Sequence, residues 1–449
     1  MIDYSLVLAV VAGIALLLIL ILQFKIQAFL SLLIASIAVG LLAGMPPMDI
    51  VDNIQKGMGG TLGYIAIVVG LGAMFGAILE SSGGVQSLAA YIIQKTGQEK
   101  ASWALAATGF LVSIPVFFDV GFVILVPVVY ALQKKTGKSL LFYGIPLLAG
   151  LAVTHAFIPP TPGPVAVASI LGADLGLVIA AGLICGIPAT IVAGPVFANF
   201  ISKRIYVETP SFIEAEVKHS KLPSPGIILA LVGLPLVLIL MNTYLDSPFG
   251  ESIPLSGPVK EIFKMMGHPF IALILANLLA WYLLGIRRGF SKQELLNINT
   301  SSLGTAGMII LITGAGGVFK QILTETGAGK MLAEVMLQYG LSAFFFAFLT
   351  AAAIRIMQGS ATVAMITAAG MTASFVEGLA FSDMKLALLV IAIASGASIL
   401  SHVNDSGFWL VSKYFGLTER QTLRSWTVMT TLIALTGFTM VLLMSAFVP

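Results

Sequence analysis

The sequence is poor in cysteine and in charge. Cys185 is the only cysteine among 449 residues, which excludes a disulfide within the chain and a cysteine-rich metal site. Asp, Glu, Lys and Arg together make up 10% of the residues, against about 25% in a typical soluble domain. The net charge is only +3, and the Lys and Arg residues gather in loops rather than on one face, so no nucleic-acid partner is expected.

Apolar residues dominate what is present. They form 58% of the chain, and the mean hydropathy is +1.03. Such a chain resides in a lipid bilayer, where the backbone must satisfy its own hydrogen bonds within helices. We therefore expect an all-α polytopic membrane protein. The first apolar run, Tyr4–Leu22, has no positively charged segment before it, which predicts a retained helix rather than a cleaved signal.

Crossing a bilayer as a helix takes about 20 apolar residues. The runs that satisfy this are Tyr4–Leu22, Ile26–Gly44, Thr61–Glu80, Leu175–Ser202, Ile227–Tyr244, His268–Ile286, Thr305–Leu323 and Gln421–Val448. An interfacial segment, Met48–Gly60, precedes the third run, and an amphipathic segment, Ser291–Leu303, precedes the seventh.

Two further stretches have polar, kinked centres and suit re-entrant hairpins. They are Ala101–Gln133, with its centre at Ser113–Gly121, and Ser342–Glu377, with its centre at Arg355–Thr362. Two more crossings are discontinuous: Leu140–Phe157 continues as Val165–Leu171 after a proline-rich break, and Lys385–Leu400 continues as Phe408–Phe415 after the polar stretch Ser401–Gly407.

The chain repeats itself at an offset of 244 residues. The matching positions are Gly63, Gly70, Gly72, Phe75, Ile78, Leu79, Gly83, Gly163 and Gly172 with Gly307, Gly314, Gly316, Phe319, Ile322, Leu323, Gly327, Gly407 and Gly416. Each copy contains an odd number of crossings, so the second is inverted relative to the first. We assign residues 1–204 and 226–449 to two inverted-topology repeats and 205–225 to a cytoplasmic connection.

The positive charges predict the orientation. With the N-terminus outside, 16 of the 23 Lys and Arg residues fall on the inner face. Both termini are then outside, the first hairpin enters from the cytoplasm, and the second enters from the outside. The hairpin tips and the two breaks are expected to meet near the middle of the bilayer.

This meeting point is the predicted binding site. The second half of a broken helix begins with free backbone N–H groups, which favour an anion. Such starts are expected near Gly121, Gly163, Ser360 and Gly407, and the small residues Gly163, Gly359 and Ala361 allow close approach to a solute. Side chains able to bond a polyhydroxylated solute are Thr161, Gln358, Ser360, Thr362, Asn404 and Ser406. Groups able to carry a proton at membrane depth are Asp119, His155, His402 and Asp405, of which Asp119, His155 and Asp405 are the candidates for proton coupling.

Several of these residues have a structural alternative. Asp119 either caps a hairpin helix or handles solute or proton. Arg355 either binds a substrate carboxylate or neutralises Asp119 or Asp405 in an ion pair. Each of His155 and His402 can be satisfied by a backbone carbonyl, and Asp405 offers His402 a local partner. Asp405 either carries the proton or holds the broken helix open.

A solute-binding site formed by two inverted repeats favours a carrier with alternating access. Two other functional classes are alternatives to a carrier. An intramembrane hydrolase would use Ser401, His402, Asp405 or Ser406, but these residues are nearly consecutive in an unwound segment, whereas a catalytic triad needs base and nucleophile held apart. A channel is the third class, and saturation and counterflow separate it from a carrier. No cofactor or metal is expected.

Four motifs in order resemble the gluconate permease family: Phe117–Gly121, His155–Pro164, Gly359–Ala364 and Ser401–Trp409. The resemblance implies proton-coupled uptake of gluconate or a close sugar acid across a bacterial inner membrane. Similarity to the wider ion-transporter superfamily implies a homodimer and an elevator motion, with scaffold regions 1–100 and 226–341 and transport regions 101–204 and 342–449. Alternative substrates are D-serine or another small hydroxy acid, and sodium-coupled carboxylate transport is an alternative mechanism.

Overall fold

The computed structural model describes residues 4–97, 100–210, 222–247, 256–327, 342–376 and 381–448, and the single residues 250, 331, 334, 338, 340 and 379. Within these ranges every regular element is a helix. The stretches long and apolar enough to cross a membrane are Pro47–Ser81, Leu140–Leu171, Leu175–Ile201, Pro225–Asp246, Pro269–Arg288, Lys292–Glu325 and Glu419–Ser445. This confirms an all-helical, multi-pass membrane protein. The extreme termini and most of the predicted connection 205–225 lie outside the described residues.

The elements of the first half are α1 (Tyr4–Leu22), α2 (Ala28–Leu42), α3 (Pro47–Ser81), α4 (Gly84–Thr96), α5 (Ala101–Val112), α6 (Phe118–Thr136), α7 (Leu140–Phe157), α8 (Pro162–Leu171), α9 (Leu175–Ile191), the short π-helix η1 (Val192–Val196) and α10 (Phe197–Ile201).

The elements of the second half are α11 (Pro225–Asp246), α13 (Gly257–Gly267), α14 (Pro269–Ala280) with η2 (Trp281–Gly285) and η3 (Ile286–Arg288), α15 (Lys292–Glu325), α17 (Ala343–Gln358), α18 (Ala361–Val376), α19 (Asp383–Ser398), α20 (Ser406–Phe415), α21 (Glu419–Thr422), η4 (Leu423–Thr427) and α22 (Val428–Ser445).

Helix bounds follow the same 244-residue offset as the glycine pairs. The half-helices α8 and α20 are both ten residues long, and they begin and end 244 residues apart. The long helices α3 and α15 end at Ser81 and Glu325, which differ by the same offset.

Two pairs of elements predicted as separate are continuous. Met48–Gly60 and Thr61–Glu80 form one helix, α3, of 35 residues, and Ser291–Leu303 and Thr305–Leu323 form one helix, α15, of 34 residues. The prediction separated them because Met48–Gly60 was interpreted as interfacial and Ser291–Leu303 as amphipathic. Tertiary packing keeps each helix continuous, since α3 and α15 lie along each other so closely that a Cβ at Gly57 would be 2.8 Å from the Cα of Val318.

Both predicted helix breaks are confirmed, and they are built differently. Ile158–Thr161 separates α7 from α8, where successive prolines remove backbone donors and prevent a continuous helix. Ile399–Asp405 separates α19 from α20 and contains no proline. Its conformation is held by polar side chains, and Leu400 adopts a positive φ of 44°.

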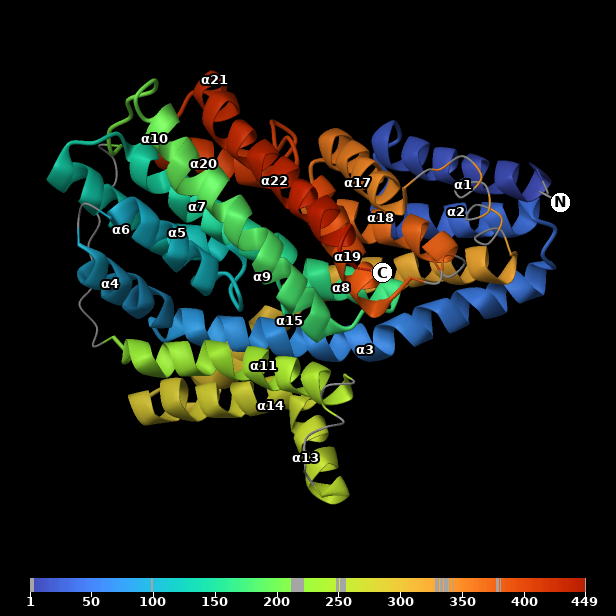
Figure 1. Cartoon of the computed structure of the whole chain (residues 1–449), viewed down its shortest axis with the longest axis horizontal. Helices are drawn as coiled ribbons and strands as arrows, with labels where there is room; N and C mark the ends of the chain where they lie inside the picture. The colour runs from blue at the N-terminus through green and yellow to red at the C-terminus, as the bar shows by residue number, and fades with distance from the viewer. Residues whose placement is uncertain are drawn as a thin grey trace.

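Helix α3 lies between two groups of helices (Figure 1). Helix α14 contacts it on one side and α8 on the other, while α15 packs along its length. Two glycines allow the second contact: a Cβ at Gly76 would collide with the carbonyl oxygen of Pro115 in the α5–α6 turn, and one at Gly72 would lie 3.2 Å from the carbonyl oxygen of Pro160. The hairpin and the first break therefore rest directly on the α3 backbone.

Candidate functional site

A cavity of about 380 Å³ lies where the two hairpins meet the second helix break. Its walls come from the first turn of α6, the last turns of α7, the α17–α18 turn, the α19–α20 break, and η4 with the start of α22. The volume falls within the range of small-molecule sites, about 300–1,000 Å³. Three helices, α6, α18 and α20, begin at this cavity, so their N-terminal dipoles favour negative charge there.

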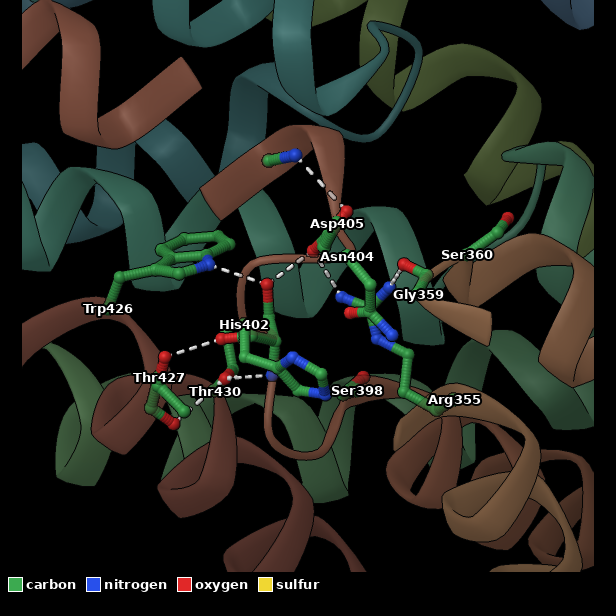
Figure 2. A network of polar contacts seen from close by, with 12 residues as sticks. Arg355, Gly359, Ser360, Ser398, His402, Asn404, Asp405, Trp426, Thr427 and Thr430 are labelled. Atoms are coloured by element: carbon green, nitrogen blue, oxygen red, sulfur yellow. Dashed lines mark hydrogen bonds and ion pairs between the residues drawn. The ribbon is translucent and has the colours of Figure 1, made fainter. Parts of the chain in front are cut away.

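Asp405 is the centre of a polar network (Figure 2). Its Oδ2 lies 2.5 Å from Nη2 of Arg355 and also accepts a hydrogen bond from the hydroxyl of Ser401. Its Oδ1 accepts a hydrogen bond from the backbone N–H of Gly407 at 3.1 Å and so caps α20. The Arg355 and Asp405 side chains are only 6% and 11% exposed. The pair is therefore a buried ion pair joining hairpin α17–α18 to the broken helix.

Ser401 anchors the other side of the break to the last helix. Its hydroxyl accepts a hydrogen bond from the indole N–H of Trp426 at 2.6 Å. Its carbonyl oxygen accepts one from the Thr427 hydroxyl at 2.5 Å, and its N–H donates to the Thr430 hydroxyl at 3.2 Å. Trp426 and Thr427 belong to the short π-helix η4, which presents both side chains to one residue.

Residues of the second break also provide hydrogen-bond partners for the C-terminal end of α17. The carbonyl of Ile356, in the last turn of α17, has no partner within its own helix. His402 Nε2 lies 2.8 Å from this oxygen, and Asn404 Nδ2 donates to it at 2.9 Å. Gly359 has φ of 90°, and a Cβ there would collide with the Asn404 carbonyl, so only glycine fits. Hairpin α17–α18 and the second break thus form one packed unit.

Asp119 has a different environment. It is the second residue of α6, its side chain is accessible from the cavity, and it makes no hydrogen bond or ion pair with the described residues. It does not cap α6 with its carboxylate. Two neighbouring groups in the cavity wall also lack partners in the described structure: Nδ1 of His155 and Oε1 of Gln358. Buried polar atoms of this kind need water or a solute.

The predicted site residues divide into two groups. Those that line the cavity are Asp119, His155, Arg355, Gln358, Gly359, Ser360, Thr362, Asn404, Asp405 and Ser406. Those that do not line it are Gly121, Thr161, Gly163 and His402.

Each residue of the second group has a packing role. Gly121 lets α6 approach Leu151 of α7, and Gly163 lies against Met365 of α18. The Thr161 hydroxyl donates to the Ile158 carbonyl at 2.5 Å, within the first break. His402 is satisfied by a backbone carbonyl, as its structural alternative proposed, although the carbonyl is that of Ile356 and the partner is not Asp405.

Other cavity residues were not singled out from the sequence. They are Phe118, Ala152, Ala156, Ser398, Trp426, Thr430 and Ile433. Trp426 and Thr430 lie on the final apolar helix, where nothing in the pattern separates them from ordinary membrane-span residues. Only their hydrogen bonds with Ser401 in the structure identify them as residues of the site.

The geometry leaves neither a catalytic pair nor a metal centre in the part of the chain that is described. His402 bonds a backbone carbonyl, and Ser401 is held by Asp405 and Trp426, so His402 does not activate Ser401. No group of three or more His, Cys, Asp or Glu side chains able to hold a metal ion is found there. The arrangement is suited to binding and releasing a polar solute.

Comparisons with known proteins agree with a transport role. The profile of the GntP family permeases matches residues 5–447. The chain is 42% identical to the low-affinity gluconate transporter of Escherichia coli K12, covering 97% of both chains. It is 39% identical to the gluconate permease of Pseudomonas aeruginosa, covering 96% of this chain and 95% of that one. The structure of Neisseria gonorrhoeae MtrF, from a class of antimetabolite efflux pumps, has the same fold, with a TM-score of 0.66, 16% identity and coverage of 96% and 94%.

Proposed function

The chain belongs to the GntP family of permeases, and from this we propose that it carries gluconate or a closely related sugar-acid anion across the inner membrane together with a proton. It is a transporter and not an enzyme. Relatives named as gluconate carriers at 42% and 39% identity over nearly the full length support the substrate.

The cavity chemistry suits such a solute. Three helix N-termini favour the carboxylate, and Ser360, Thr362, Asn404 and Ser406 offer groups for the hydroxyls. The unpartnered atoms of His155 and Gln358 add one site each. Hydroxyl recognition by polar groups of this kind discriminates strongly against solutes that lack the hydroxyls.

The proposal of proton coupling rests on which charged side chains of the cavity are paired and which are not. Arg355 is neutralised by Asp405, so the cavity keeps no free cation among its described lining residues. The unpaired charge is that of Asp119, and a carboxylate beside an anionic solute disfavours its binding unless one of the two is protonated. A proton on Asp119 therefore enters with the solute. Asp405, held by three partners, maintains the broken helix instead of carrying the proton.

The matching helix bounds support a mechanism of alternating access. Residues 1–204 and 226–449 act as inverted repeats, and the α5–α6 and α17–α18 hairpins re-enter the membrane from opposite sides. Scaffold regions 1–100 and 226–341 stay fixed in a homodimer, while transport regions 101–204 and 342–449 move with the solute. Both termini lie outside.

Purified protein in liposomes tests the function. An inward proton gradient should drive accumulation of labelled gluconate, a protonophore should abolish it, and sodium should have no effect. A panel of unlabelled gluconate, other aldonates, D-serine, lactate and glycerate should compete in the order of their likeness to gluconate. Sodium-dependent, proton-independent uptake contradicts the coupling, and stronger competition by D-serine than by any aldonate contradicts the substrate.

A further inference from the structure

A second cavity, of about 420 Å³, lies directly behind Asp119. It is formed by the last turns of α3, the α5–α6 turn and first residues of α6, and one face of α15. Phe117 and Asp119 line both this cavity and the solute cavity. Asp119 is therefore the one charged side chain, among the described residues, that lines both cavities.

Glu80 is the other charged group of the second cavity. Its side chain is partly buried near the C-terminal end of α3, and no described residue bonds to its carboxylate. The rest of the described lining is uncharged. No cation in this lining offsets either carboxylate.

The second cavity can hold a chain of waters. Its volume far exceeds the roughly 10–15 Å³ that one water needs, and Ser81, Ser301 and Ser302 provide hydroxyl groups along its wall. A carboxylate, water and a second carboxylate form an ordinary path for proton transfer. The end of α3 also lies near the connection between the halves, since the Ser87 hydroxyl in α4 donates to the Pro223 carbonyl at 2.5 Å. By the distribution of positive charge, that end faces the cytoplasm.

We propose that Glu80 is a proton-relay residue, and that the second cavity carries the proton between Asp119 and the cytoplasm by a route separate from that of the solute. This rests on the proposed proton-coupled transport. The proton leaves the carboxylic acid of Asp119, passes through water to the Glu80 carboxylate, and is released to the cytoplasm, which restores both carboxylates. Glu80 contacts no solute, because it does not line the solute cavity.

Two assays on one liposome preparation separate the roles. Counterflow exchanges labelled for unlabelled gluconate without a gradient and needs no net proton movement, whereas accumulation under a proton gradient needs a proton released in every cycle. Glu80→Gln should lower the rate of proton-driven accumulation about tenfold or more and leave counterflow close to that of the wild type. Glu80→Asp, which keeps a titratable group, should restore most of the accumulation.

The matched control is Glu325→Gln. Glu325 ends α15, the counterpart of α3, but it accepts a hydrogen bond from Gln321 and lines a different cavity, with Asp49 and Asp52. This variant should leave both assays unchanged. The relay would be overturned if Glu80→Gln and Glu325→Gln gave equal rates in both assays. It would also be overturned if Glu80→Gln lost counterflow in parallel with accumulation. Absence of gluconate counterflow in the wild type would instead contradict the proposed function on which it rests.

Discussion

The guanidinium of Arg355 and the carboxylate of Asp405, 50 residues apart in the chain, meet at 2.5 Å and join the end of α17 to the start of α20. Arg355 also donates to the Gly359 carbonyl, so one side chain fixes the hairpin turn and the helix break together. Because both charges are buried, the loss of one partner leaves the other uncompensated.

We predict that Asp405→Asn destabilises the protein. Breaking one side of a buried ion pair costs about 3–5 kcal/mol. Thermal unfolding in detergent, followed by size-exclusion chromatography after heating, measures the loss. The double variant Arg355→Met with Asp405→Leu removes both charges and should unfold at a higher temperature than Asp405→Asn. A single variant as stable as the wild type would show that the ion pair does not hold the break.

Asp119→Asn should uncouple transport from the proton. The variant keeps the shape of the side chain but cannot ionise, so the carrier should equilibrate gluconate without concentrating it. Uptake in liposomes with and without an inward proton gradient provides the measurement, and counterflow should persist.

The control for this variant is Asp174→Asn. Asp174 caps α9 by accepting a hydrogen bond from the Leu177 N–H at 2.8 Å, and it does not line the solute cavity. Asparagine caps helices about as well as aspartate, so this variant should transport normally. Gradient-driven accumulation by Asp119→Asn would remove Asp119 from the coupling step.

Gly76→Ala should slow transport while the protein still folds. An added methyl group collides with the Pro115 carbonyl and pushes the α5–α6 turn away from α3, at a cost of about 1–3 kcal/mol. If this contact slides during transport, the maximal rate falls more than the apparent affinity changes. Gly63→Ala lies in the same helix with nothing within 4 Å of the new Cβ and should transport like the wild type. Equal rates in the two variants would contradict a moving contact at Gly76.

Gln358→Met should weaken recognition of the solute. One uncharged hydrogen bond contributes about 0.5–1.5 kcal/mol, which corresponds to a rise in KM of about two- to tenfold with little change in maximal rate. Initial uptake rates over a range of gluconate concentrations give both constants. Gln86→Met is the comparison, since its Oε1 is also buried without a partner but lies outside the solute cavity. A KM unchanged from the wild type would place Gln358 outside the set of solute ligands.

Much of the fold could be read from the sequence, because hydropathy and the cost of polar groups in lipid are local properties. The two breaks illustrate this: Pro159 and Pro160 forbid a continuous helix, and Asn404 with Asp405 is too polar for an ordinary span. The boundary errors at Gly60 and Leu303 have the opposite origin. The more polar segments Met48–Gly60 and Ser291–Leu303 were interpreted as separate from the spans that follow them, but packing between α3 and α15 keeps each helix continuous.

The site was harder to predict, because it depends on partners that are distant in sequence. Arg355 could be placed at membrane depth, but the choice between a solute and Asp405 as its partner required the fold. His402 and Asn404 both point to the Ile356 carbonyl, a contact that no residue pattern encodes. The cavity role of Trp426 was missed for the same reason.

Each charged residue of the site lacks a charged counterpart in the other half. At the 244-residue offset, Arg355 corresponds to Leu111, Asp405 to Thr161, and Asp119 to Val363. The cavity therefore carries its charges asymmetrically, with a buried ion pair from the second half and a carboxylate from the first half. An open-chain sugar acid is also asymmetric, with a carboxylate at one end and a hydroxymethyl group at the other. Under the proposed function, a diacid of the same length would bring a second negative charge into a cavity that has no free cation among its described lining residues, and we expect it to compete poorly.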